Sequence, residues 1–276
     1  MSVIIENNMK YKVNNVEINL PDQLKDFDYF TEDPFIIFEK KNFIDESSYQ
    51  KLVKEIYTYG GFQKTFSGSG DKKSNTIHGS NLFTINDGTF KDFCSAILHK
   101  NFFRWFKKTH LLFFKHKFLK IYFVNRRNMF LRILHRLSKI LKLPISVFYT
   151  EIEYSSITNG GYILPHTDDY TKRLSFVFYL PDINKDFTSE MEKQLGTTFW
   201  KAQKTSVSPI KRFASTFLKG KEIKDFYKDY EPFRTSTYEK NKIAGFIKSD
   251  NSWHSVERFD FVHDRRAIVI NVYEWL

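Results

Sequence analysis

Three residues of the chain could together hold a metal ion. His166 and Asp168 stand two apart in the segment PHTDD, and His254 follows much later in the segment DNSWHSV. Alternate side chains of an extended segment share a face, so the first two would point the same way. Two imidazoles and one carboxylate are the donor set of non-haem Fe(II) sites, which keep open positions on the metal. The alternative is that these are unrelated polar residues near strand ends.

Two arginines open the last apolar segment, RRAIVINVYEWL. An arginine that faces the inside of a barrel needs an anionic partner, because an unpaired buried charge is costly. A carboxylate would be such a partner, since it matches the guanidinium in a bidentate contact. A surface arginine is the alternative, and the position of the pair alone leaves open whether Arg265 or Arg266 would point inward.

The segments around these residues are typical of an all-β core. From 145 to 276 the chain consists mainly of short, β-branched and aromatic runs separated by polar, Gly, Pro or Asn residues. This pattern predicts an antiparallel sandwich or barrel. Between 201 and 241 the chain is polar and basic without a period, so this part is interpreted as an insertion.

Helices are expected before this core. Residues 1–32 are expected to form a loosely structured lead-in, and residues 33–60 predict a short strand followed by a helix. Asp45 could cap that helix, and its apolar stripe has the spacing i, i+3, i+4, i+7. The stripe consists of Tyr49, Leu52, Val53 and Ile56. Residues 64–80 are rich in Ser, Gly, Lys and Asn and are expected to form a loop.

Basic and aromatic residues interleave between 90 and 143, where the pattern turns helical. In the stretch MFLRILHRLSKILKL one face would carry leucines and the other mostly Lys and Arg. These leucines are Leu131, Leu134, Leu137 and Leu141. One interpretation is a pair of amphipathic helices packed on the main domain with a solvated basic face. The other is a surface at 100–142 that binds anionic lipid or nucleic acid.

The composition bounds the class of protein. The chain has 276 residues, of which 41% are hydrophobic, so it can bury a sizeable core. Its net charge of +11 fits either an anionic partner or a solvated basic surface, and the charge is not spread evenly along the chain. Cys94 is the only cysteine, which excludes an intramolecular disulfide. We expect a cytoplasmic protein, because neither a signal peptide nor a transmembrane segment is visible.

The quoted segments also carry a family resemblance. The stretch from about Tyr149 to Leu276 resembles the Fe(II)- and 2-oxoglutarate-dependent oxygenases, particularly the prolyl-hydroxylase-like branch. YSSITNGGYILPHTDD is similar to the strand that leads into the His-x-Asp motif of that branch. KIAGFIKSDNSWHSV is similar to its distal-histidine segment, and RRAIVINVY to its Arg-x-Ser/Ala strand.

The resemblance implies a double-stranded β-helix, or jelly roll, within a single oxygenase domain over 1–276. It makes His166, Asp168 and His254 the metal ligands and Arg265 the residue that binds 2-oxoglutarate. Hydroxyl groups near the cosubstrate would be those of Tyr154 and Tyr179. The gap from the distal histidine to the arginine is about one residue longer than in the family, which a bulge would absorb or which would make Arg266 the binder instead.

The implied cofactors are Fe(II), 2-oxoglutarate and dioxygen, and ascorbate is compatible as an auxiliary reductant. The implied reaction is hydroxylation of a C–H bond of a small-molecule, peptidyl or sugar-linked substrate. A nucleic-acid oxidative demethylase is a second interpretation, weakened because AIVINVY lacks the additional arginine of the repair enzymes. A third is a non-catalytic jelly-roll protein that docks to anionic surfaces through the basic helices.

Overall fold

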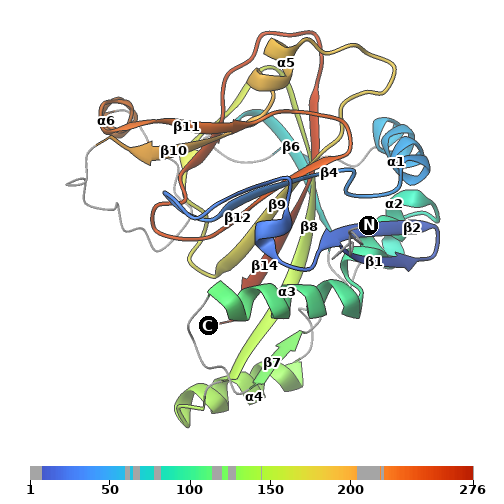
Figure 1. Ribbon diagram of the computed structural model, residues 1–276, viewed down its shortest axis with the longest axis vertical. Coiled ribbons are helices and arrows are strands. Elements are labelled where there is room, and N and C mark those ends of the chain that lie inside the picture. The colour runs from blue at the N-terminus through green and yellow to red at the C-terminus, as the bar shows by residue number, and fades with distance from the viewer. Residues whose placement is uncertain are drawn as a thin grey trace, which may run out of the picture.

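The computed structural model describes residues 8–59, 63–64, 69–77, 82–113, 120–123, 129–143, 145–203, 218 and 221–275 (Figure 1). The strands are β1 (Asn8–Val13), β2 (Val16–Pro21), β3 (Tyr29–Thr31), β4 (Ile37–Lys41), β5 (Gln63–Lys64), β6 (Ser69–Ile77), β7 (Lys120–Phe123), β8 (Ile145–His166), β9 (Lys172–Tyr179), β10 (Thr197–Ala202), β11 (Tyr230–Ser236), β12 (Lys242–Ile247), β13 (His254–Val256) and β14 (Arg265–Glu274). The helices are α1 (Glu46–Thr58), α2 (Thr89–Ile97), α3 (Lys100–Phe113), α4 (Met129–Ile140), α5 (Ser189–Gln194) and α6 (Lys221–Asp229), with 3₁₀ turns at Leu24–Asp26 and Leu82–Thr84.

The order of the strands is that of a jelly roll. Along the sheet it runs β11-β10-β13-β8-β14-β9-β12-β4-β3. The long strand β8 belongs to both halves, because residues 148–157 pair with β14 whereas Ile163 and His166 pair with β13. Two four-stranded halves result, β8-β14-β9-β12 and β8-β13-β10-β11, joined by the interlocking connections of two Greek keys. The predicted jelly-roll core is therefore confirmed.

Strand β9 shows how the sequence builds both the core and the cavity. Its residues Phe176 and Phe178 are fully buried with the aromatic side chains of the N-terminal helices. Strand alternation turns Ser175 and Val177 to the opposite face, which is the inside of the jelly roll. Packing of the helices on one face thus fixes which residues the other face presents to the cavity.

The predicted strand and helix at 33–60 are confirmed as β4 and α1. The side chain of Asp45 accepts a hydrogen bond of 2.9 Å from the backbone N–H of Ser48, which caps α1. The predicted stripe is buried on the sheet, and it comprises Tyr49, Leu52, Val53 and Ile56. Gly60 and Gly61, which follow this helix in the sequence, lie outside the described residues.

The substitution Asp45→Ala is expected to destabilise the fold by about 1–2 kcal/mol, because a helix cap of this type contributes that amount. The same carboxylate also accepts from the backbone N–H of Glu17 at 3.2 Å, so its loss frees two donors. Denaturant unfolding of the wild type and the variant measures the difference. The capping role would be refuted by equal unfolding free energies.

Residues 1–32 contain more structure than the sequence pattern indicates. The strands β1 and β2 form an antiparallel hairpin, and Val16, Ile18 and Leu20 are buried against the helices. The expectation of a loosely structured lead-in was therefore wrong, because the alternation in VEINLP marks a strand that pairs with β1.

The stretch 201–241 is likewise not a plain insertion. It contains α6 and then β11, which pairs with β10 in the jelly roll. β11 carries mostly half-exposed polar residues and Pro232, as is typical of an edge strand, so no apolar period marks it. Residues 204–217 and 219–220 of this stretch lie outside the described residues.

The basic aromatic region is helical over α2, α3 and α4, as predicted, and it also contains β7, which runs parallel to the start of β8. α3 packs as an amphipathic helix, with Phe102, Trp105 and Phe106 buried. In α4 the side chain of Leu137 is exposed, so this part of the leucine face does not pack on the domain. In the part of the chain that the structure describes, no helix is long and apolar enough to cross a bilayer.

Candidate metal centre

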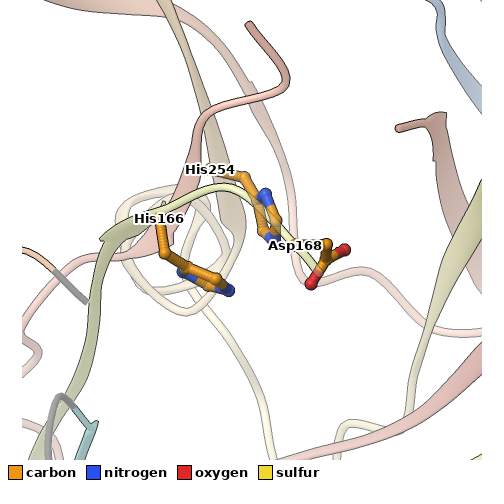
Figure 2. Close-up of side chains that lie close together, drawn as sticks. All are labelled: His166, Asp168 and His254. Carbon is orange, nitrogen blue, oxygen red and sulfur yellow. Dashed lines mark ion pairs between the residues drawn. The ribbon is translucent and has the colours of Figure 1, made fainter. Parts of the chain in front are cut away.

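Strand pairing brings the two histidines together. His166 is the last residue of β8 and His254 the first of β13, and the two residues are partners in the antiparallel ladder. Asp168 follows β8 by two residues. Figure 2 shows the three side chains grouped together, and one ligand atom of each lies within 4.8 Å of the others. This set could hold one metal ion.

Backbone carbonyls orient both imidazole rings. Nδ1 of His166 lies 2.9 Å from the carbonyl oxygen of Leu164, and Nδ1 of His254 lies 3.0 Å from that of Ser252. A carbonyl can only accept, so each Nδ1 carries the proton and donates it. Each Nε2 then keeps its lone pair for a metal, which is the usual arrangement of metal-binding histidines.

The carboxylate of Asp168 is held on both oxygens. Lys172 Nζ donates to Oδ1 at 2.7 Å, and Ser175 Oγ lies 3.0 Å from Oδ2. Oδ2 also lies 4.0 Å from Nε2 of His254, so this oxygen faces that histidine. Burial opposes ionisation, but Lys172 and then the two histidines outweigh it and hold the pKa of Asp168 well below its usual range.

The histidines are neutral around pH 7. Burial, followed by the nearby His254, lowers the pKa of His166 to about 3. Burial likewise lowers the pKa of His254, against the opposing effect of Asp168. Two neutral imidazoles and an ionised carboxylate are the protonation states that a divalent metal requires of its ligands.

The metal-free protein should lose stability as the pH falls from about 6.5 towards 3. In that interval the unfolded chain takes up a proton on His166 and the folded chain does not, so acid favours unfolding. The substitution His166→Gln should make the fall of the melting temperature with pH shallower. Thermal unfolding in a chelating buffer at several pH values measures this. An unchanged slope in the variant would contradict the account.

Arg265 lies in the same cavity. It is buried, its Nε donates to the carbonyl oxygen of Leu195 at 2.6 Å, and one terminal nitrogen donates to Thr197 Oγ1 at 3.2 Å. Among the described residues no carboxylate lies within ion-pair distance of it. Burial lowers the pKa of Arg265, which records the cost of a charge without a counter-ion. The site therefore fits a ligand that brings a carboxylate.

Arg266 and Tyr154 lie on the opposite face of the sheet. A terminal nitrogen of Arg266 donates to the carbonyl oxygen of Ile56 at 3.1 Å and lies 3.5 Å from the hydroxyl of Tyr154. That hydroxyl donates to the same carbonyl at 3.1 Å. Both side chains thus face α1, and the structure does not bring Tyr154 into the cavity.

Tyr179 lies behind Arg265 and supports it. Its hydroxyl is 2.9 Å from Thr197 Oγ1, which itself accepts from Arg265. The centre of its ring is 5.7 Å from the guanidinium carbon. Tyr179 therefore supports Arg265 from behind and is not among the residues that line the cavity. Thr197, Val177 and Ser155 are lining residues, as is Arg265 itself.

Several polar residues of the cavity were missed by the sequence analysis. Lys172 contacts Asp168, and Lys72 forms an ion pair of 2.5 Å with Glu153 on the cavity wall. Asn271 lies 3.0 Å from Ser175. The position of Ser175 and Asn271 follows from alternation on β9 and β14, so this signal was available. No local pattern marks Lys72, which comes from a distant segment.

Asp169 does not contribute to the metal site as Asp168 does, but stabilises a turn. Its Oδ1 accepts from the backbone N–H of Thr171 at 2.7 Å and from the hydroxyl of the same residue. It closes the turn between β8 and β9 and takes no part in the three-residue set. The structure thereby separates the two adjacent aspartates of the PHTDD segment.

Comparison with known proteins gives similarities of fold only. No family model and no curated protein matches the chain. Among solved structures, a prolyl-4-hydroxylase of Pseudomonas putida shares 10% identity over 86% of this chain and 91% of its own, with a TM-score of 0.45. The epimerase SnoN from nogalamycin biosynthesis shares 10% sequence identity over 86% of this chain and 78% of its own, with a TM-score of 0.47. HygX from Streptomyces hygroscopicus was solved with nickel, 2-oxoglutarate and hygromycin B bound. It shares 8% sequence identity over 86% of this chain and 82% of its own, with a TM-score of 0.44. At this level of similarity, no residue role in this chain follows from those proteins.

Proposed function

We propose that this protein is an Fe(II)- and 2-oxoglutarate-dependent oxygenase. The observation that carries the proposal is the buried set of His166, Asp168 and His254 in a cavity that also holds Arg265. Two imidazoles and one carboxylate leave half of an octahedral metal open, which is what a bidentate cosubstrate and dioxygen require.

His166 and His254 would bind the iron through Nε2, because their Nδ1 protons are engaged by backbone carbonyls. Asp168 would bind through Oδ2, since Lys172 occupies the other oxygen. Lys172 and Ser175 would hold this carboxylate in a fixed orientation, as residues behind metal ligands commonly do. When bound, iron with 2-oxoglutarate and dioxygen supplies an oxidant strong enough to attack a C–H bond, with succinate and carbon dioxide as co-products.

Arg265 would bind the C5 carboxylate of 2-oxoglutarate. Its guanidinium is fixed by Leu195 and Thr197 and still has donors free to face the cavity. A dianionic ligand would supply the missing counter-ion, and closure of the site around it would exclude water. Tyr179 would act through Thr197 as a positioning residue.

Hydroxylation is the reaction we assign by default, on a small-molecule, peptidyl or sugar-linked substrate. The ion pair of Lys72 and Glu153 lies on the cavity wall and offers both a cationic and an anionic contact. Such a wall suits a substrate with polar or charged groups near the oxidised carbon.

Anaerobic titration calorimetry tests the proposal. Fe(II) should bind to the chelator-treated protein with a stoichiometry of one, and 2-oxoglutarate should bind only after the metal. Succinate, which lacks the keto group needed for chelation, should bind much more weakly to the metal-loaded protein. If neither Fe(II) nor Mn(II) binds, or if 2-oxoglutarate binds equally well without metal, the proposal fails.

A further inference from the structure

The charge of the chain is concentrated in one region. Residues 93–150 contain no aspartate or glutamate but contain thirteen of the 43 lysines and arginines of the chain. The remaining 30 basic residues face 32 acidic ones, so the rest of the protein is nearly neutral. The net charge of +11 therefore belongs to the region of α2, α3, β7 and α4 and not to the surface as a whole.

The apolar side chains of α4 that the structure describes point outward. Its inner side holds His135 and Ser138, which are buried, and the ring of His135 lies 6.4 Å from that of Trp275. On the outer side the exposed fractions are 51% for Ile133, 51% for Leu137, 75% for Ile140 and 66% for Leu141. These four residues follow the spacing i, i+4, i+7, i+8 and form one stripe along the helix. The stripe continues to Leu143, which is also exposed.

Basic side chains border this stripe. Arg136, Lys139 and Lys142 are exposed on α4 and on the turn after it. At 100° per residue Arg136 and Lys139 lie beside the stripe and toward the protein body, and Lys142 lies in the turn that follows. The helix thus presents aliphatic groups outward with cations along its flank. This distribution is that of a helix that lies in the interface of an anionic membrane, with its apolar side in the acyl boundary and its cations at the headgroups.

The location of α4 suits such a contact. Figure 1 shows it at the lower end of the molecule, beyond α3 and beside β7. It adjoins the first residues of β8, whereas the candidate metal ligand His166 is the last residue of that strand. A flat surface could therefore meet α4 without covering the cavity.

We propose that α4 docks the protein peripherally on a bilayer that contains anionic lipid. A second copy of the chain fits this surface less well, because it would place Arg136 and Lys139 against their own like charges. A nucleic acid also fits less well, because the stripe is aliphatic and offers no aromatic ring on which a base could stack. The proposal is independent of the proposed enzymatic function.

Vesicle sedimentation of the full-length protein tests this proposal. The wild type should bind vesicles of phosphatidylcholine with phosphatidylglycerol, should bind phosphatidylcholine alone much more weakly, and should be released by salt. The double substitution Ile140→Glu and Leu141→Glu should weaken binding at least about tenfold. Neutralising Arg136 and Lys139 with glutamine should weaken it about fivefold for each charge.

Matched controls separate docking from a general effect of charge. Val262 is 88% exposed on the loop before β14, so Val262→Glu adds a negative charge elsewhere and should leave vesicle binding unchanged. Lys228→Gln on α6 is the corresponding control for loss of a cation. Because the outer residues of α4 are exposed, the double glutamate variant should melt at the wild-type temperature.

Three results would overturn the proposal. The first is that the wild type binds vesicles with and without anionic lipid equally well, or binds neither kind of vesicle. The second is a lower melting temperature of the double glutamate variant, which would show that the stripe is packed in the fold. The third is a wild-type dimer or an oligonucleotide complex that the α4 substitutions abolish while vesicle binding stays unchanged.

Discussion

His166→Ala is expected to lower the affinity for Fe(II) at least about 100-fold and to remove 2-oxoglutarate turnover. Loss of a group that merely orients a metal ligand already costs 10–100-fold, and this substitution removes a ligand itself. The remaining pair, Asp168 and His254, would leave the metal with too few protein ligands. Calorimetry with Fe(II) under argon measures the affinity directly.

His263→Ala is the matched control, because this histidine lies in the loop before β14, outside the cavity-lining set. It should bind Fe(II) as the wild type does. The two adjacent aspartates give a second comparison. Asp168→Asn should lower the affinity for Fe(II), whereas Asp169→Asn should leave it unchanged. Retention of wild-type affinity by His166→Ala would remove this residue from the site.

Arg265→Gln is expected to weaken 2-oxoglutarate binding at least about 30-fold, equivalent to about 2 kcal/mol, with Fe(II) binding unchanged. The carboxylate would lose its charged partner in a buried site, where such a loss costs the most. The measurement is calorimetry of 2-oxoglutarate with the metal-loaded variant, and the dependence of turnover on 2-oxoglutarate should shift by the same factor.

Arg266→Gln is the matched control for this prediction. Its side chain faces α1 and contacts Ile56 and Tyr154, so 2-oxoglutarate affinity should stay within about twofold of the wild type. The reverse pattern, with a weakened Arg266 variant and an unaffected Arg265 variant, would refute the assignment. Unfolding measurements on both variants show whether either loss reflects an unstable fold.

The sequence predicted best where one local rule decided the outcome. Alternation along RRAIVINVY predicts that Arg265 and Ala267 share one face and Ile268 takes the other, and the family resemblance made the face of Arg265 the inner one, as observed. The position of Asp45 before an apolar stripe predicted the start of α1 correctly. In both cases the period of the backbone fixes which side chains share a face, without knowledge of the rest of the fold.

Tyr154 shows why the rule has limits. Counting by twos back along β8 from His166 turns Tyr154 toward the cavity. The ladder with β13 pairs His254 with His166 and Val256 with Ile163, so β8 carries one extra residue there. This bulge reverses the alternation, and the odd residues Glu153 and Ser155 line the cavity instead. Gly160, with a φ of 75°, marks an irregular part of β8, but the sequence does not reveal how far the alternation shifts.

The orientation of α4 also could not be predicted. Its amphipathic pattern identifies an apolar face and a basic flank, but the pattern is the same whether the apolar face packs on the protein or points away. The structure turns Leu137 outward and His135 inward, where its ring lies 6.4 Å from that of Trp275 at the far end of the chain. Tertiary contacts of this range are not encoded in a local period.

The most direct test of the central claim is succinate formation from 2-oxoglutarate by the purified protein loaded with Fe(II), in the presence and absence of dioxygen. The account predicts slow succinate release that requires both iron and dioxygen, is lost in His166→Ala and persists in His263→Ala. Addition of the correct substrate would accelerate it. Absence of succinate, in a protein that also binds neither Fe(II) nor 2-oxoglutarate, would contradict the account.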